Sequence, residues 1–67
     1  MKPDWKDAPE WANYLAMDQA RRWHWHESRP KRFFSSWLCN GNDKCQMANG
    51  TIDKSEIFVR DSLEQRP

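Results

Sequence analysis

Arg22-Trp23-His24-Trp25-His26-Glu27 is the stretch of this sequence that decides the fold. Its two tryptophans alternate with arginine and histidine at a period of two. That is the period of a β-strand, because successive side chains of a strand point to opposite faces. The stretch therefore predicts a strand with one aromatic face and one cationic or titratable face.

Turn residues divide the chain after this strand into short segments. Ser28-Arg29-Pro30 ends the strand, and Phe33 to Cys39 predicts a second strand with an aromatic residue on each face. Asn40-Gly41 and Asn49-Gly50 are turn dipeptides that enclose a short segment from Cys45 to Ala48. The middle of the chain therefore predicts an antiparallel β-meander.

The chain before the strand permits two interpretations. Asp7-Ala8-Pro9-Glu10 has the spacing of a capping box with an early proline, which favours a helix from Ala8 to Arg22. The alternative is a helical turn over Pro9 to Ala12, followed by a strand from Asn13 to Asp18 that reverses near Gln19-Ala20. Propensity favours the helix.

The C-terminal part is also ambiguous. Asp53-Lys54-Ser55-Glu56 again has capping-box spacing, but the residues after it prefer a strand, so we expect a strand over Glu56 to Arg60. Residues 6–10 and 60–64 share a basic-Asp-small-x-Glu pattern. Chance explains this pattern at such a length, and a degenerate repeat or two similar turn caps are the alternatives.

Sixty-seven residues allow one small domain, residues 1–67, and a chain of this size buries only roughly 60% of the surface that it exposes when unfolded. Five Trp, three Phe and one Tyr supply a dense core. We expect a β-rich domain, an antiparallel meander of three to four strands with short helical turns; the alternative is an α+β fold with an N-terminal helix. The expected core residues are Trp11, Trp23, Trp25, Trp37 and Phe58.

Charge and hydropathy indicate which partners and which cellular compartment to expect. The formal net charge is +1, with a basic middle between acidic ends, so the chain as a whole is not an electrostatic nucleic-acid binder. No stretch is apolar enough to span a membrane, and the first residues lack a secretory pattern. We therefore expect a cytoplasmic protein in which Cys39 and Cys45 are thiols, although a hairpin would bring them close enough to bond under oxidation.

Two constellations of residues suggest binding chemistry. Two imidazoles on one strand face and two thiolates at a hairpin have the donors of a zinc site, although five residues between the cysteines are more than structural zinc sites usually have. The ligands of such a site would be His24, His26, Cys39 and Cys45. Tryptophan and arginine, both present in the middle of the chain, are the residue types most enriched at protein-interface hot spots. The residues expected to bind a partner are Arg21, Arg22, Trp25, Arg29, Lys31, Arg32 and Trp37.

Several stretches resemble small tryptophan-rich proteins encoded by tailed bacteriophages: DWKDAPEWA (4–12), YLAMD (14–18), WHWHE (23–27) and SLEQRP (62–67). In that family an Asp-Gly turn commonly separates the Ala-Met-Asp segment from the Trp-x-Trp segment, which implies a β-hairpin. Here Gln19-Ala20-Arg21 replaces that turn. The resemblance implies a phage or prophage accessory protein in the host cytoplasm and brings no defined activity with it.

The functional expectation joins these observations. The chain has no Gly-rich phosphate loop and no metal-hydrolase motif, so we expect neither an enzyme nor a bound cofactor. We expect a phage-type accessory protein that binds a host protein, inhibiting or redirecting it. RNA or single-stranded DNA binding through an aromatic and arginine platform is the first alternative, and a small structural zinc-binding domain is the second.

Overall fold

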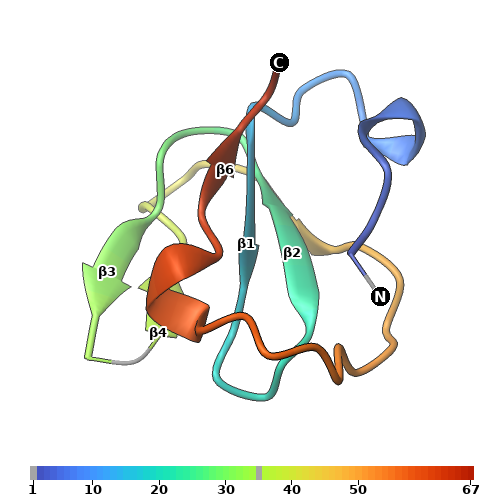
Figure 1. Ribbon diagram of the computed structural model, residues 1–67. Coiled ribbons are helices and arrows are strands. Elements are labelled where there is room, and N and C mark those ends of the chain that lie inside the picture. The colour runs from blue at the N-terminus through green and yellow to red at the C-terminus, as the bar shows by residue number, and fades with distance from the viewer. Residues whose placement is uncertain (1, 35) are drawn as a thin grey trace.

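The computed structural model describes residues 2–34 and 36–67, and two antiparallel sheets make up most of its regular structure (Figure 1). The main sheet has the strand order β5-β2-β1-β6, and β3 pairs with β4 in a separate sheet. Two short 3-10 helices, η1 and η2, accompany the strands. The elements are η1 Trp5–Asp7, β1 Tyr14–Met17, β2 Trp23–His26, β3 Lys31–Phe33, β4 Ser36–Leu38, β5 Cys45–Met47, η2 Val59–Asp61 and β6 Glu64–Gln65.

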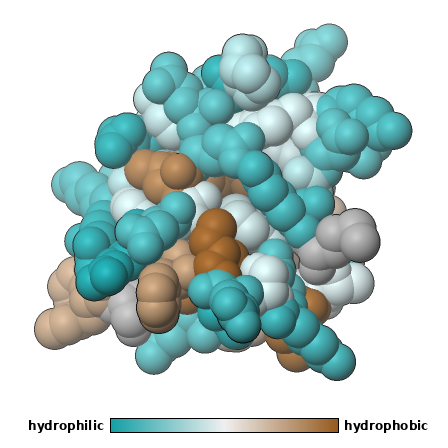
Figure 2. All heavy atoms as spheres, in the orientation of Figure 1, coloured by the Kyte–Doolittle hydropathy of each residue, from teal (hydrophilic) through white to brown (hydrophobic). Residues whose placement is uncertain are grey.

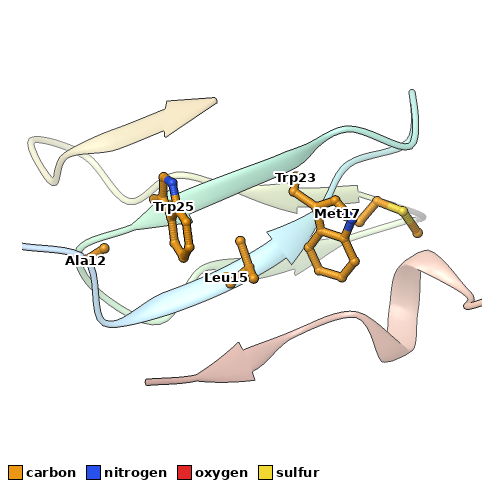
Figure 3. Packing of buried hydrophobic residues seen from close by; sticks show 5 residues of the cluster. All are labelled: Ala12, Leu15, Met17, Trp23 and Trp25. Atoms are coloured by element: carbon orange, nitrogen blue, oxygen red, sulfur yellow. The ribbon is translucent and has the colours of Figure 1, made fainter. Parts of the chain in front are cut away.

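One face of the main sheet forms the hydrophobic core. Leu15 pairs with Trp25 and Met17 with Trp23 across the β1–β2 hairpin, so the aromatic positions of β2 meet the apolar positions of β1 (Figure 3). All four are almost fully buried, and burial of a large apolar side chain stabilises a fold by roughly 1.5–3 kcal/mol. Partly buried residues that precede and follow the hairpin in the sequence pack against them: Trp5, Ala8, Trp11, Ala48, Ile57 and Val59.

The opposite face of β2 carries the two histidines. His24 and His26 alternate with the core tryptophans, as the period of a strand requires. Residues of β4 contact β1 on this side, and Ser36 and Trp37 line a cavity together with both histidines. The β3–β4 sheet therefore covers the titratable face of the main sheet.

The β1–β2 turn places Arg21 in a left-handed conformation, with a φ of 63°. A residue with a Cβ is strained there by about 1–2 kcal/mol, whereas glycine is not. Asp18 closes the turn: its amide donates to the Arg22 carbonyl at 2.9 Å, and its Oδ1 accepts from the Arg22 amide at 3.0 Å. The hairpin thus forms without the glycine that the phage resemblance associates with it.

The Arg21 side chain binds a segment that is distant in sequence. Its Nε donates to the Asp53 carbonyl at 2.7 Å, and its Nη2 donates to the carbonyls of Ser55 and Ile57 at 2.6 and 3.0 Å. In return, the Asp53 amide donates to the Arg21 carbonyl at 2.7 Å. Residues 53–57 belong to no helix or strand, so these bonds hold them on the hairpin.

A buried hydrogen bond joins the core to the same segment. Trp23 Nε1 donates to Asp53 Oδ2 at 2.7 Å, and the Ser55 amide donates to Asp53 Oδ1 at 2.8 Å. Hydrogen bonds from Ser55 and from the indole favour the charged carboxylate and lower the pKa of Asp53 to about 2. Asp53 is therefore an ionised side chain that the fold buries with its hydrogen bonds made.

The expected fold class is confirmed: the chain forms a small β-rich domain of antiparallel strands with short helical turns. The predicted strands over Arg22–Glu27 and Asn13–Asp18 correspond to β2 and β1, and the segment Cys45–Ala48 contains β5. The described residues form six strands rather than three or four. The order departs from a simple meander, because β5 and β6 add to opposite edges of the β1–β2 hairpin.

Three local predictions are wrong. The alternative helix from Ala8 to Arg22 does not form, because pairing between β1 and β2 outweighs helix propensity. The strand predicted over Phe33–Cys39 is divided between β3 and β4, since Phe34 turns the chain with a φ of 55°; Ser35 lies outside the described residues. The strand predicted over Glu56–Arg60 is replaced by an irregular segment and η2.

The core prediction is also partly wrong. Trp23 and Trp25 are buried and Trp11 packs against them, but Trp37 is only half-buried and Phe58 is 64% exposed. Phe58 directly precedes η2, and the carbonyl of the residue before it, Ile57, accepts a hydrogen bond from the Arg21 side chain. The neighbours of Phe58 on either side, Ile57 and Val59, pack against the core in its place.

The similar sequence patterns near the two ends belong to similar turns. Lys6-Asp7 ends η1 and Arg60-Asp61 ends η2. After each, the next amide closes the turn: Ala8 donates to the Trp5 carbonyl and Ser62 donates to the Val59 carbonyl, both at 3.1 Å. Of the alternatives left open by the sequence, two similar turn caps describe this arrangement.

Arg21 provides a paired test of the turn. We expect Arg21→Ala to lower the free energy of unfolding by about 2–4 kcal/mol, because it keeps the strained backbone and removes charge-assisted hydrogen bonds. Arg21→Gly removes the same bonds but relieves the strain, so it should be about 1 kcal/mol more stable than the alanine variant. Urea unfolding of both variants measures the difference. Equal stability of both variants and the parent protein would contradict this account of the turn.

Asp53 makes the free energy of unfolding depend on pH in the acidic range. Its pKa is lowered from 3.8 in the unfolded chain to about 2 in the fold. Its contribution, about 2 kcal/mol, is therefore complete above pH 4 and is lost as the pH falls toward 2. Urea unfolding measures the free energy of unfolding at pH 5 and at pH 2. Between these two values it should fall by about 2 kcal/mol less in Asp53→Asn than in the parent protein. An identical acid loss in both proteins would show that Asp53 is not the group responsible.

Candidate functional site

Exposed aromatic residues gather on the β3–β4 hairpin and beside η2. Phe34 is 83% exposed and Phe58 64%, and Phe33, whose ring meets that of Phe34 edge to face at 4.5 Å, is also exposed. Figure 2 shows hydrophobic side chains among the hydrophilic ones on this side of the molecule. Phe34 combines this exposure with left-handed backbone, which is rare for a bulky residue and is a signal of function.

A shallow groove of about 390 Å³ lies beside Phe34. We call it the Phe34 groove. Its walls combine apolar side chains with three guanidinium groups, and the Arg60 guanidinium lies 5.4 Å from the centre of the Phe58 ring. The lining residues are Arg21, Arg32, Phe34, Phe58, Val59 and Arg60.

The three guanidinium groups of the groove are not equally available to a ligand. Arg21 uses its donors on internal carbonyl groups, and Arg60 Nε lies 3.7 Å from Asp61 Oδ2. Arg32 is exposed, and its Nε has a long contact of 3.5 Å with the Phe34 carbonyl. Arg32 is therefore the cation of this groove best placed to meet an external carboxylate.

The residues expected to bind a partner do not share one surface. Arg21 and Arg32 line the Phe34 groove, whereas Trp25 is buried in the core. Trp37 is half-buried and its Nε1 donates to the Val59 carbonyl at 2.8 Å. The others, outside the groove, are the partly buried Arg22 and the exposed Arg29 and Lys31.

Four residues of the groove are absent from the set that the sequence predicts to bind a partner. The strands predicted over Phe33–Cys39 and Glu56–Arg60 include Phe34, Val59 and Arg60, and the predicted core includes Phe58. The available signal was the pair Phe33-Phe34 directly after Lys31-Arg32, since two adjacent aromatic residues point to opposite faces of a strand and seldom both find a core.

A second cavity, of about 240 Å³, lies between the two sheets on the histidine face of β2. Its wall contains donor side chains from β2, from the end of β4 and from the start of β5. The lining residues are Ala16, Asp18, His24, His26, Ser36, Trp37, Cys39 and Cys45.

Cys39 and Cys45 are joined by a disulfide, which corrects the expectation of two thiols. The loop over residues 40–44 reverses the chain and brings the two Cα atoms to 6.2 Å, within the range that a disulfide spans. The Cys45 sulfur lies 3.3 Å from Nδ1 of His26. Three of the four zinc ligands predicted from the sequence are therefore together, with donor atoms within 4.8 Å of one another.

The fourth, His24, has another partner. Its Nε2 lies 2.7 Å from Asp18 Oδ2. Burial raises the pKa of Asp18, but hydrogen bonds from the Arg22 amide and from His24 outweigh it, and the pKa is lowered overall. Burial, with a smaller contribution from the charge of His24, lowers the pKa of His26 to about 4, so His26 is neutral at pH 7.

No protein-family model matches this chain, and neither a curated protein nor a solved structure matches it significantly. Among the described residues, no helix has the length and apolar character needed to cross a membrane. The groove and the cavity are therefore the features on which a functional argument rests.

The disulfide gives a further test of the structure. Closing a loop of this length restricts the unfolded chain, so reduction should lower the free energy of unfolding by about 2 kcal/mol. Urea unfolding with and without a phosphine reductant measures the change. The Cys39→Ser, Cys45→Ser double variant should resemble the reduced protein and ignore the reductant. Parent protein that is equally stable in both conditions would argue against the disulfide.

Proposed function

We propose that this protein is a phage or prophage accessory protein that binds a host protein in the bacterial cytoplasm through the Phe34 groove. The phage setting rests on the resemblance of residues 4–27 and 62–67. The binding role is supported chiefly by one observation: Phe34 is held in a left-handed conformation with its ring in solvent. Both properties oppose stability, so a role outside the fold is the physical reason to retain them.

The chemistry of the groove favours a protein partner of a particular kind. Phe34, Phe58 and Val59 offer apolar contacts, while Arg32 offers an exposed guanidinium at the rim. An apolar side chain followed by a carboxylate would bury its apolar part against the phenylalanines and meet Arg32 with its charge. We therefore propose an acidic segment of a host protein as the occupant, bound without a chemical reaction.

The same face is less suited to a nucleic acid. A phosphate chain requires several free cations along its path, because counterion release supplies most of the affinity. Of the three arginines in the groove, Arg21 is engaged internally and Arg60 lies beside Asp61. The formal net charge of +1 adds no long-range attraction. Nucleic-acid binding is therefore an outcome to be tested rather than the function we propose.

Substitution of Phe34 separates binding from folding. Asparagine tolerates left-handed backbone and has no ring, so Phe34→Asn should keep or raise the thermal midpoint. Loss of a central aromatic anchor should weaken partner binding by about tenfold or more. The measurement is capture from nuclease-treated bacterial lysate on immobilised protein, followed by titration of the recovered partner against each variant.

Lys31→Ala is the matched control for Arg32→Ala. Lys31 is an exposed cation on the same strand, but it points to the opposite face and does not line the groove. The proposal expects Arg32→Ala to weaken binding and Lys31→Ala to leave it unchanged. Capture that is indifferent to Phe34→Asn would count against the proposal, and so would recovery of nucleic acid in a parallel capture from lysate without nuclease.

A further inference from the structure

The Cys39–Cys45 disulfide lies against a buried imidazole. In the β2–β5 pairing, His26 and Cys45 are directly opposite each other, so their side chains share one face of the sheet. Nδ1 of His26 and Sγ of Cys45 are 3.3 Å apart. Cys39 reaches the same point from the end of β4, across the loop over residues 40–44. Three elements of the fold therefore bring these donors together.

These donors are the types that bind zinc. Two thiolates and one imidazole form a three-ligand set, to which a water molecule adds a fourth position. With bonds of about 2.0–2.3 Å, tetrahedral zinc places its ligand atoms about 3.3–3.8 Å apart. The separation between His26 Nδ1 and Cys45 Sγ already has this value. The two sulfurs must separate and all three donors must come within this range, from positions that already lie within 4.8 Å of one another. The loop that joins the cysteines contains Gly41, with no atom close to its Cβ position.

We propose that the disulfide is the oxidised form of a zinc site made by Cys39, Cys45 and His26. A dithiol of the thioredoxin class supplies two electrons and two protons, becomes a disulfide itself, and leaves Cys39 and Cys45 as thiols. One Zn²⁺ then binds both sulfurs and Nδ1 of His26, and the two thiol protons are released. The disulfide and the zinc site exclude each other, because both use the same two sulfur atoms.

The fourth zinc position faces the cavity between the sheets. His24 lines this cavity, but its Nε2 is held 2.7 Å from Asp18 Oδ2, and it is not among the donors within 4.8 Å of one another. A water molecule in the cavity therefore completes the coordination. This makes His24 a matched control for His26: both are histidines on the same face of the same strand.

The site links the two sheets whichever form is present. The disulfide joins the end of β4 to the start of β5 and so ties the β3–β4 hairpin to the main sheet. Zinc bound by Cys39, Cys45 and His26 makes the same connection when the sulfurs are reduced. The inference does not rest on the proposed binding function, because it concerns the internal face of this hairpin rather than the Phe34 groove.

Metal titration of the full chain tests this assignment. Zn²⁺ is added to oxidised and to phosphine-reduced protein in competition with a chromogenic zinc indicator, and Co²⁺ is added to the reduced protein. The reduced parent protein should bind one Zn²⁺ per chain and the oxidised protein none. Co²⁺ should give the near-ultraviolet charge-transfer band of thiolate coordination together with tetrahedral visible bands.

Variants assign the ligands. His26→Gln should weaken zinc binding by more than about 100-fold, since loss of even an outer-shell partner costs 10–100-fold, and His24→Gln should bind as the parent does. If His26→Gln does not fold, the Cys39→Ser, Cys45→Ser variant replaces it and should bind no zinc and give no charge-transfer band. Reduced parent protein without stoichiometric zinc, equal binding by the oxidised protein, or greater loss from His24→Gln than from His26→Gln would overturn the proposal.

Discussion

The hydrogen bond from the buried Trp23 indole to the Asp53 carboxylate is the interaction on which the rest of this structure depends. Burying an indole N–H without a hydrogen-bond partner costs stability, so a buried tryptophan favours a nearby acceptor. Here that partner is a charged group, which must itself be satisfied. The Asp53 carboxylate accepts hydrogen bonds from the Trp23 indole and the Ser55 amide. The Asp53 amide in turn donates to the Arg21 carbonyl. This buried contact, together with the hydrogen bonds of Arg21, holds residues 53–57, which have no strand of their own.

This anchoring also positions the surface beside it. Once Arg21 holds the carbonyls of Asp53, Ser55 and Ile57, the chain continues into η2, where Phe58 points to solvent and Val59 packs inward. The Trp37 indole donates to the Val59 carbonyl and fastens the β3–β4 hairpin to the same place. The Phe34 groove therefore forms between two segments that polar contacts, rather than a large core, bring together.

The alternating residues of β2 predicted that strand because period two is a local property, and the β-rich fold followed from it. The left-handed turn at Arg21 was not predictable, since an arginine there is stable only through carbonyl partners more than thirty residues away. Residues 33–39 read as one strand because strain at Phe34 leaves no sequence signal. The donors at Cys39, Cys45 and His26 were identified by type, but their meeting depends on the β2–β5 register.

Native-state hydrogen exchange tests the central claim, that Trp23 and Asp53 hold the C-terminal half on the hairpin. The indole N–H of Trp23 and the amide of Asp53 should exchange only through global unfolding, with the same opening free energy as the amides paired between β1 and β2. If the Asp53 amide and the Trp23 indole exchanged through a lower-energy local opening while the β1–β2 amides stayed protected, the hairpin would be stable without this anchor and the account would be wrong.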